Sequence, residues 1–144
     1  MGIKAGIDLG NMYSKVAIMD KKGQPVIIHI GMEDERIPSV IRFQADGIIV
    51  GSWAKEFEEW TDVEPGYVSN FVDRVGMEAP YLTFDGKEYK AEELTAILLS
   101  YLKKGIEDIE DIAPSTIDKV VIAVPSWWGG WELAAIIRAA KKAG

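Results

Sequence analysis

The chain opens with a strict alternation of apolar and polar residues. The apolar positions are Ile3, Ala5, Ile7 and Leu9. A period of two is typical of a β-strand with one buried face, so we expect a strand over residues 3–9 whose other face carries Asp8. Gly10 and Asn11 are residue types that adopt positive φ and predict a sharp turn, and the alternation resumes over residues 13–18. The sequence therefore predicts a tight hairpin with Asp8 at the carboxyl end of its first strand.

Short strands and one helix are predicted in the middle of the chain. The predicted strands cover residues 25–30, 38–43, 47–51, 81–84 and 87–90. The first continues an antiparallel set of three, and Asp85-Gly86 between the last two is the pair typical of a two-residue hairpin turn. Ser52 is a residue type that caps a helix, which we expect over residues 53–60. The stretch 67–76 is ambiguous.

Two helices and an apolar strand are predicted in the last third. A long helix beginning near Ala91 is indicated by apolar residues three and four apart, at Leu94, Ile97, Leu98, Tyr101, Leu102 and Ile106. Residues 117–124 are almost continuously apolar, which predicts a strand buried on both faces in a parallel or mixed sheet covered by helices. A last helix over residues 131–143 would end at Gly144. Its expected buried face consists of Leu133, Ile136, Ile137 and Ala140.

Composition narrows the class of protein. The 144 residues fit one domain, and 48% apolar with 27% charged residues is typical of a globular chain. A net charge of -7 without a cluster of Lys and Arg argues against nucleic acid as the main partner. There is no cysteine and one histidine, His29, which excludes thiolate chemistry and a multi-histidine metal site. No apolar run reaches the roughly 20 residues that cross a bilayer, so we expect a cytoplasmic protein without a membrane partner.

The hairpin at Asp8 is the strongest candidate for chemistry. The backbone N–H groups of a turn can form a nest that binds a phosphate, and a carboxylate beside them can hold a hydrated divalent cation. An ordinary hairpin with a solvated acid would have the same pattern. The local sequence leaves both interpretations open.

Four blocks carry a more specific signal because they follow one another in a fixed order. They are Gly6 to Gly10 with Tyr13-Ser14, Pro38 to Phe43 with Val50-Gly51 and Ala54-Lys55, Phe84 to Tyr89 with Glu92-Glu93-Leu94, and Val120 to Pro125 with Ala140 to Gly144. Together they resemble the N-terminal lobe, subdomains IA and IB, of the seventy-kilodalton heat-shock (Hsp70) chaperones, in the actin-like ATPase superfamily. A bacterial shape-determining actin homologue would share only the first and last blocks.

This resemblance implies an α/β fold of the ribonuclease-H-like class. Its mixed sheet, flanked by helices, would form a core of residues 1–34 and 91–144, with a small α+β subdomain inserted at about 35–90. The implied cofactors are ATP or ADP with Mg²⁺. Asp8 would be the catalytic and metal residue, acting through a metal-bound water, and the implied phosphate-binding residues are Gly10, Asn11, Met12 and Tyr13.

In the family a second lobe supplies the rest of the nucleotide cleft. Phosphoryl transfer needs groups on all sides of the phosphate, so we expect this chain alone to bind nucleotide weakly and to turn it over hardly at all. The expected partners are the missing second lobe or a second copy of the chain, and a protein client or cochaperone.

Several positions depart from the family pattern. Asn11 and Met12 stand where the family has two threonines, and Val72 stands at the position of a lysine near the attacked phosphate, with Arg74 as the nearby cation. Leu133 replaces the basic residue of the interdomain relay. Asn11, Met12 and Val72 favour an alternative function, a non-catalytic binding or assembly module on the same fold that associates with itself.

Three tryptophans near the last helix bear on that alternative. Two of the set Trp127, Trp128 and Trp131 are expected to take the place of core aromatics, with Trp131 exposed as an anchor for a partner. Burial of all three remains open. A ribonuclease-H-like nuclease, a third interpretation, would need Glu92 or Glu93 as a second acid beside Asp8, and the strand that ends at Pro125 brings no acid to support it.

Overall fold

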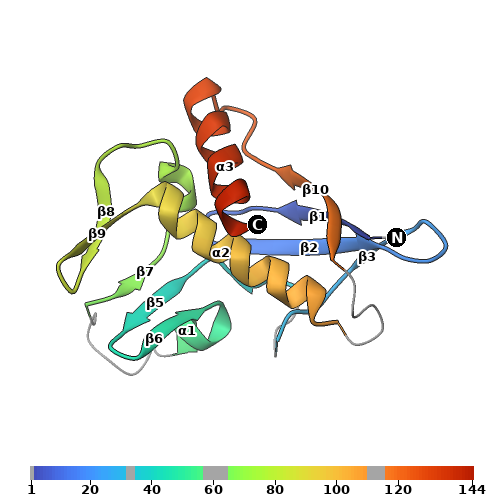
Figure 1. The fold of residues 1–144 in the computed structure, drawn as a ribbon, viewed down its shortest axis with the longest axis horizontal. Coiled ribbons are helices and arrows are strands. Elements are labelled where there is room, and N and C mark those ends of the chain that lie inside the picture. The colour runs from blue at the N-terminus through green and yellow to red at the C-terminus, as the bar shows by residue number, and fades with distance from the viewer. Residues whose placement is uncertain (1, 32–34, 57–64, 110–115) are drawn as a thin grey trace.

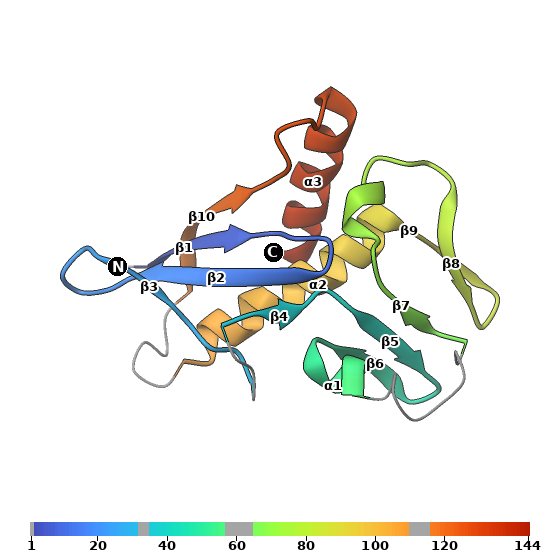
Figure 2. The same ribbon diagram turned by 180° about the vertical axis from the view of Figure 1, so that it is seen from behind.

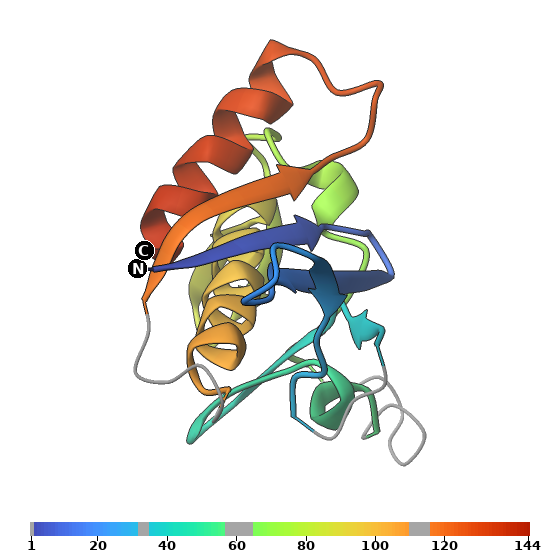
Figure 3. The same ribbon diagram turned by 90° about the vertical axis from the view of Figure 1, so that its right-hand side faces the viewer.

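The computed structural model describes residues 2–31, 35–56, 65–109 and 116–144. The chain has a mixed α/β fold, in which two long helices lie against one face of a sheet and a smaller β-rich part lies beside it (Figure 1). Figure 3 shows both helices on the same side of that sheet. In the part of the chain that the structure describes, no helix has the length and apolar character needed to span a membrane.

The larger sheet is built around the predicted hairpin. Its strands are β1 (Ile3–Asp8), β2 (Tyr13–Met19), β3 (Pro25–Ile27), β4 (Ile37–Pro38) and β10 (Ile117–Ala123). The order is β10-β1-β2-β3, with β4 also paired to β2, and β10 runs parallel to β1 while the others are antiparallel. The expected set of three antiparallel strands and the mixed sheet are confirmed, although β3 ends three residues earlier than predicted.

The middle of the chain forms two smaller sheets. The first contains β5 (Ile41–Gln44), β6 (Gly47–Val50) and β7 (Tyr67–Val68), and the second contains β8 (Pro80–Phe84) and β9 (Lys87–Lys90). Positive φ at Asp85 and Gly86 confirms the two-residue turn between β8 and β9. The predicted strand over 38–43 is instead split between β4 and β5.

Two short helices belong to the same middle part. The helix α1 covers Ser52–Glu56, so most of the predicted helix over 53–60 lies outside the described residues. The ambiguous stretch 67–76 contains β7 and a short 3-10 helix, Val72–Arg74. The division into a core and an inserted subdomain stays a prediction, and β4, inside the expected insertion, pairs with the larger sheet.

The long helix α2 (Ala91–Glu107) is the centre of the core. Its predicted apolar face is confirmed, since Leu94, Leu98, Leu102 and Ile106 are each 0% exposed. The start of the helix is capped by one hydrogen bond, in which the Lys90 N–H donates to the Glu93 carboxylate at 3.0 Å. This hydrogen bond, followed by the nearby Lys142, lowers the pKa of Glu93.

The last helix, α3 (Gly130–Ala143), buries a different face from the one expected. Ala135, Ile136 and Ala139 are buried, and α3 packs on α2. Leu133 and Ile137, expected in the core, are 42% and 54% exposed. Alanine side chains let two helices approach closely, so the small residues face α2 while the larger apolar ones lie along an open side.

The strand β10 is also less buried than its sequence predicts. It lies at the edge of the sheet, paired only with β1 in the described strand order, and Val121 is 65% exposed. A run of apolar residues predicts cover on both faces, but α2 and α3 lie on the same side of the sheet (Figure 3) and β10 has no described strand beyond it at the edge. Val120, Ile122, Leu133 and Ile137 therefore line an open apolar groove of about 370 Å³ between β10 and α3.

Candidate functional site

Asp8 lies where the sequence predicts it, as the last residue of β1 and exposed. It stands opposite Lys15 of β2 on one side and Ala123 of β10 on the other. The turn that follows it lies beside the segment between β7 and β8, as Figure 2 shows. The acid is therefore placed at the mouth of the hairpin, next to a second segment that the sequence left unassigned.

Glycine is required at position 10 because another backbone group lies close to its Cα, and not because the turn needs a positive φ there. The positive φ values of the described residues fall at other turns and at neither Gly10 nor Asn11, which corrects the expected turn geometry. A Cβ at Gly10 would lie 2.0 Å from the carbonyl oxygen of Tyr13. A side chain cannot be accommodated at Gly10, because the Tyr13 carbonyl is a backbone group and can move only if the turn itself changes.

A buried serine holds the turn in place. Ser39, 0% exposed, donates its hydroxyl to the Gly10 carbonyl at 2.7 Å and its N–H to the Met12 carbonyl at 2.9 Å. The hydroxyl of Ser14, also 0% exposed, lies 2.9 Å from that of Ser39. Since the proton of Ser39 is used on Gly10, Ser14 is the donor in this pair.

These hydrogen bonds fix the direction of the turn's amides. In a trans peptide the C=O and the following N–H point in opposite directions. Because the carbonyls of residues 10 and 12 point to Ser39, the N–H groups of Asn11 and Tyr13 point away from it. Two neighbouring amides with this orientation, close to Asp8, are suited to an anion accompanied by a cation.

Replacing Ser39 by alanine tests this arrangement. Ser39→Ala leaves the Gly10 carbonyl and the Ser14 hydroxyl buried without their partner, so we expect the free energy of unfolding to fall by about 2 kcal/mol. Ser14→Ala, which removes a donor and leaves the bond from Ser39 to Gly10, should cost less than half of this. Urea denaturation of the two variants measures the difference, and equal losses would contradict the proposed direction of the bonds.

The Asn11 side chain is used within the protein. Its amide nitrogen donates to Asn70 Oδ1 at 3.2 Å, and its oxygen accepts the Asp73 N–H at 3.2 Å. Asn70 has a positive φ of 56°, which asparagine tolerates better than most residues. Asn11 therefore joins the turn to the segment before β8, and its backbone N–H remains its contribution to an anion site.

The other residues expected near the phosphate differ in exposure. Met12 is 68% exposed and contributes its backbone, whereas the Tyr13 hydroxyl accepts a hydrogen bond from Lys55 Nζ at 2.6 Å. Val72 is 0% exposed and belongs to the core, so it brings no polar group to the turn. Arg74 is exposed and lies 3.9 Å from the sulfur of Met77.

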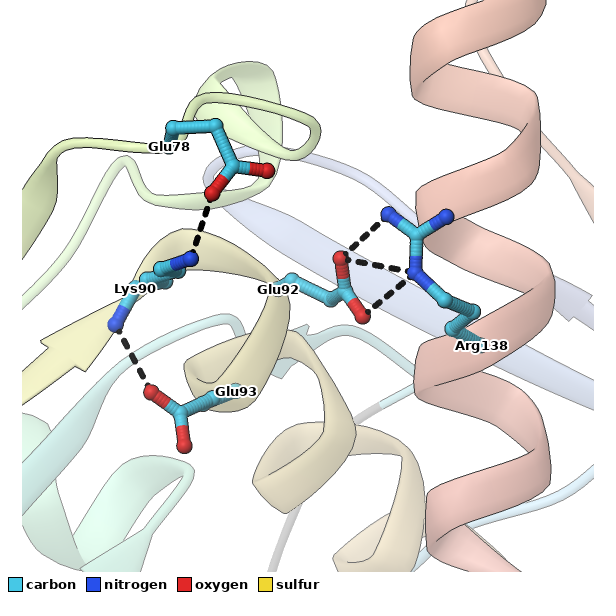
Figure 4. Close-up of polar contacts among 5 residues, drawn as sticks. All are labelled: Glu78, Lys90, Glu92, Glu93 and Arg138. Carbon is cyan, nitrogen blue, oxygen red and sulfur yellow. Dashed lines mark hydrogen bonds and ion pairs between the residues drawn. The ribbon is translucent and has the colours of Figure 1, made fainter.

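Glu92 and Glu93, the acids that a nuclease would require, take part in ion pairs between helices. Arg138 of α3 binds Glu92 with its closest contact at 2.8 Å (Figure 4). Lys142 Nζ lies 3.4 Å from Glu93. Lys90 pairs with Glu78, and this hydrogen bond lowers the pKa of Glu78. The ion pairs of Glu92 and Glu93 join α3 to the start of α2. Both glutamates are thus used in structural ion pairs, and the nuclease interpretation gains no support.

The three tryptophans near α3 differ from the expectation in how many of them are buried. Trp128 is buried at 9% exposure, while Trp127 and Trp131 are 77% and 85% exposed. The exposed position of Trp131 is confirmed, and the expectation of two core tryptophans is wrong by one. Trp127 lies in a turn before α3, which the Trp128 N–H closes by donating to the Pro125 carbonyl at 3.2 Å.

The residues at the hairpin fit magnesium bound mainly through water and phosphate. Among the described residues, no group of three or more acids or histidines could enclose a metal ion. Mg²⁺ usually keeps several waters and is held by one or two carboxylates together with substrate phosphates. The exposed carboxylate of Asp8, beside amides that point away from Ser39, satisfies that requirement. It would not be enough for a metal held by protein ligands alone.

The sequence predicts the positions of Asp8 and the turn, but not the residues that hold the turn in place. Ser39 and Lys55 stand in the blocks quoted for the resemblance, but the local pattern gives neither a role. Asn70 has no signal at all in the sequence beyond its turn-forming type. Their contacts with the turn join residues 29, 42 and 59 positions apart.

Comparison with known proteins gives one consistent result. The sequence matches the family described as "Hsp70 protein" over residues 4–69 and 67–144. It is 35% identical over 139 residues to the chaperone protein DnaK of Mycoplasma mobile, and 33% identical over 123 residues to that of Ureaplasma urealyticum. These alignments cover 96% and 85% of this chain but 22% and 19% of the relatives. The chain thus spans about a fifth of the length of the relatives it matches.

Proposed function

Because the chain belongs to the Hsp70 family, we propose that it supplies the first phosphate-binding hairpin of an ATP or ADP site. The observation that carries this proposal is the Ser39-held turn after Asp8, in which the N–H groups of Asn11 and Tyr13 point away from the buried Ser39. In the proposed site the backbone of residues 10–13 binds phosphate oxygens, and Asp8 holds a hydrated Mg²⁺. Bound Mg²⁺ would neutralise part of the phosphate charge.

The chain's own residues support binding more than hydrolysis. Val72 is buried at the position where the resemblance implies a lysine, and Asn11 uses its side chain to join two segments. The phosphate would therefore be held on one side, by amides and by Asp8. Since transfer depends on charge stabilisation from all sides, we expect this chain to bind nucleotide without measurable turnover unless a second lobe completes the cleft.

The fold and the family support three further parts of the proposal. The ribonuclease-H-like class is supported by three antiparallel strands followed, after α2, by the parallel strand β10. A protein client or a cochaperone is the partner that the DnaK relatives suggest, because they are named chaperone proteins. The cytoplasm is the compartment that we propose, because the sequence has no cysteine.

An assembly module is the second candidate function, favoured by the open edge of β10. Two identical edge strands pair antiparallel about a two-fold axis, and the groove of β10 and α3 offers exposed Val120, Leu133 and Ile137 to bury. A second copy of the chain is the occupant that we propose for this groove. Formation of this dimer does not involve the hairpin turn, which lies between β1 and β2.

Nuclear magnetic resonance distinguishes the two candidates on one sample. Addition of ADP and Mg²⁺ should shift the amide signals of Asn11 and Tyr13, because these N–H groups are the proposed phosphate donors. The signals of Asp85 and Gly86 in the distant β8–β9 turn should stay unchanged. Molar mass from light scattering reports the dimer. Shifts absent from the hairpin would contradict the nucleotide site, and a dimer without such shifts would leave the assembly function as the correct one.

A further inference from the structure

A small cavity of about 160 Å³ lies beside the hairpin turn, on the side of β4, α1 and β7. Polar groups from three parts of the chain line it, namely those of Asn11, Tyr13, Lys55, Tyr67, Ser69 and Asn70. Ligand pockets for whole small molecules are usually about 300 Å³ or larger, so this cavity is sized for one chemical group. Asp8 is not among its lining residues.

The charge around this cavity is opposite to that of the whole chain. Lys55 Nζ lies 4.8 Å from the centroid of the Tyr13 ring, and the guanidinium carbon of Arg36 lies 5.2 Å from the same centroid. The described lining residues include no carboxylate, although the protein has a net charge of -7. Lys55 lines the cavity, and Arg36 contacts the same ring from outside the lining. Positive charge at this position favours the approach of an anion.

The hydrogen-bonding groups at the cavity suit an oxyanion. Lys55 donates to the Tyr13 hydroxyl at 2.6 Å, which orients the ammonium group at the cavity wall and leaves it two further protons to donate. Ser69 and Asn70 are linked by a 3.3 Å hydrogen bond, and Tyr81 fixes their backbone by donating to the Ser69 carbonyl at 2.8 Å. The cavity thus combines a positioned cation with hydroxyl and amide groups on a fixed backbone.

We propose that this cavity binds a phosphate group, with Lys55 as the counter-charge and Tyr13 as its positioning residue. The phosphate comes either from a nucleotide held at the adjacent hairpin, in which case the inference rests on the proposed function, or from free phosphate. Sequence similarity gave Lys55 no role, and its place at the cavity follows from the contact with Tyr13, 42 residues away.

Titration with three probes tests the proposal. Wild type, Lys55→Ala and Lys55→Gln are each titrated with inorganic phosphate, pyrophosphate and ADP, with Mg²⁺ present. Removing one charge-assisted donor should weaken phosphate binding by about tenfold. Lys87→Ala is the matched control, because Lys87 Nζ also lies against a tyrosine ring, 4.6 Å from the centroid of Tyr89, in the separate β8–β9 hairpin. It should bind all three probes as wild type does.

The outcomes separate this inference from the proposed function. If the Lys55 variants bind all three probes as tightly as wild type, the inference is wrong while ADP binding can still support the hairpin site. If wild type binds phosphate through Lys55 but not ADP, the cavity stands and the nucleotide function fails. Weakening for ADP as well as for phosphate identifies the nucleotide as the source, and weakening for phosphate alone identifies the free ion. Absence of binding by wild type for every probe overturns both.

Discussion

Gly10→Ala is expected to lower the free energy of unfolding by about 3 kcal/mol and to abolish phosphate binding at the hairpin. The added Cβ would lie 2.0 Å from the Tyr13 carbonyl oxygen, so the turn has to open. Opening moves the Gly10 carbonyl away from the buried hydroxyl of Ser39, which loses its 2.7 Å hydrogen bond. The N–H of Asn11 would then lose its outward direction.

A second glycine in the same hairpin provides the matched control. Gly6 lies in the middle of β1, and a Cβ built there has nothing within 4 Å. Gly6→Ala should therefore change the free energy of unfolding by less than about 1 kcal/mol. Urea denaturation of both variants measures the effect. Similar stability for the two would show that the close approach at Gly10 is not what shapes the turn.

Periodicity predicted the elements of this fold more successfully than it predicted their surroundings. The alternation over residues 3–9 and the three-and-four spacing of α2 reflect contacts along one element, and both are found as predicted. The continuous apolar run of β10 and the apolar face of α3 were expected in the core, but both border an open groove. A sequence pattern records that a residue is suited to burial, and it does not record which neighbour buries it.

In the candidate site, too, local structure was predictable from the sequence and contacts between distant segments were not. Asp8 and Gly10 could be placed from local residues because a strand and its turn are local structures. Ser39 and Lys55 could not be assigned, because each contact depends on bringing distant segments together. Asn11 was expected among the phosphate-binding residues, and the structure uses its side chain to join the turn to Asn70 and Asp73. Polar residues at a site can hold it together as well as bind.

Asp8→Asn is expected to weaken Mg²⁺-dependent ADP binding at least about tenfold. Asparagine keeps the shape of the side chain and removes the charge that attracts a hydrated cation. Asp8 is exposed at the strand end, so the fold should not depend on that charge. Loss of binding with unchanged stability would therefore report the site itself.

Asp46 offers a control for the loss of one negative charge. It is exposed in the turn between β5 and β6, on the smaller sheet. Asp46→Asn changes the net charge by the same amount as Asp8→Asn and leaves the hairpin intact. Any general effect of charge on ADP binding should therefore appear equally in both variants.

Isothermal titration of the chain with ADP, with and without Mg²⁺, tests the central claim most directly. We predict binding of wild type with Kd of about 100 µM or tighter, equivalent to about 5.5 kcal/mol, dependent on Mg²⁺. Asp46→Asn should match it, while Asp8→Asn should bind at least about tenfold more weakly. Binding that is absent in wild type, or that is equal in wild type and Asp8→Asn, would contradict the assignment of this hairpin as a nucleotide phosphate site.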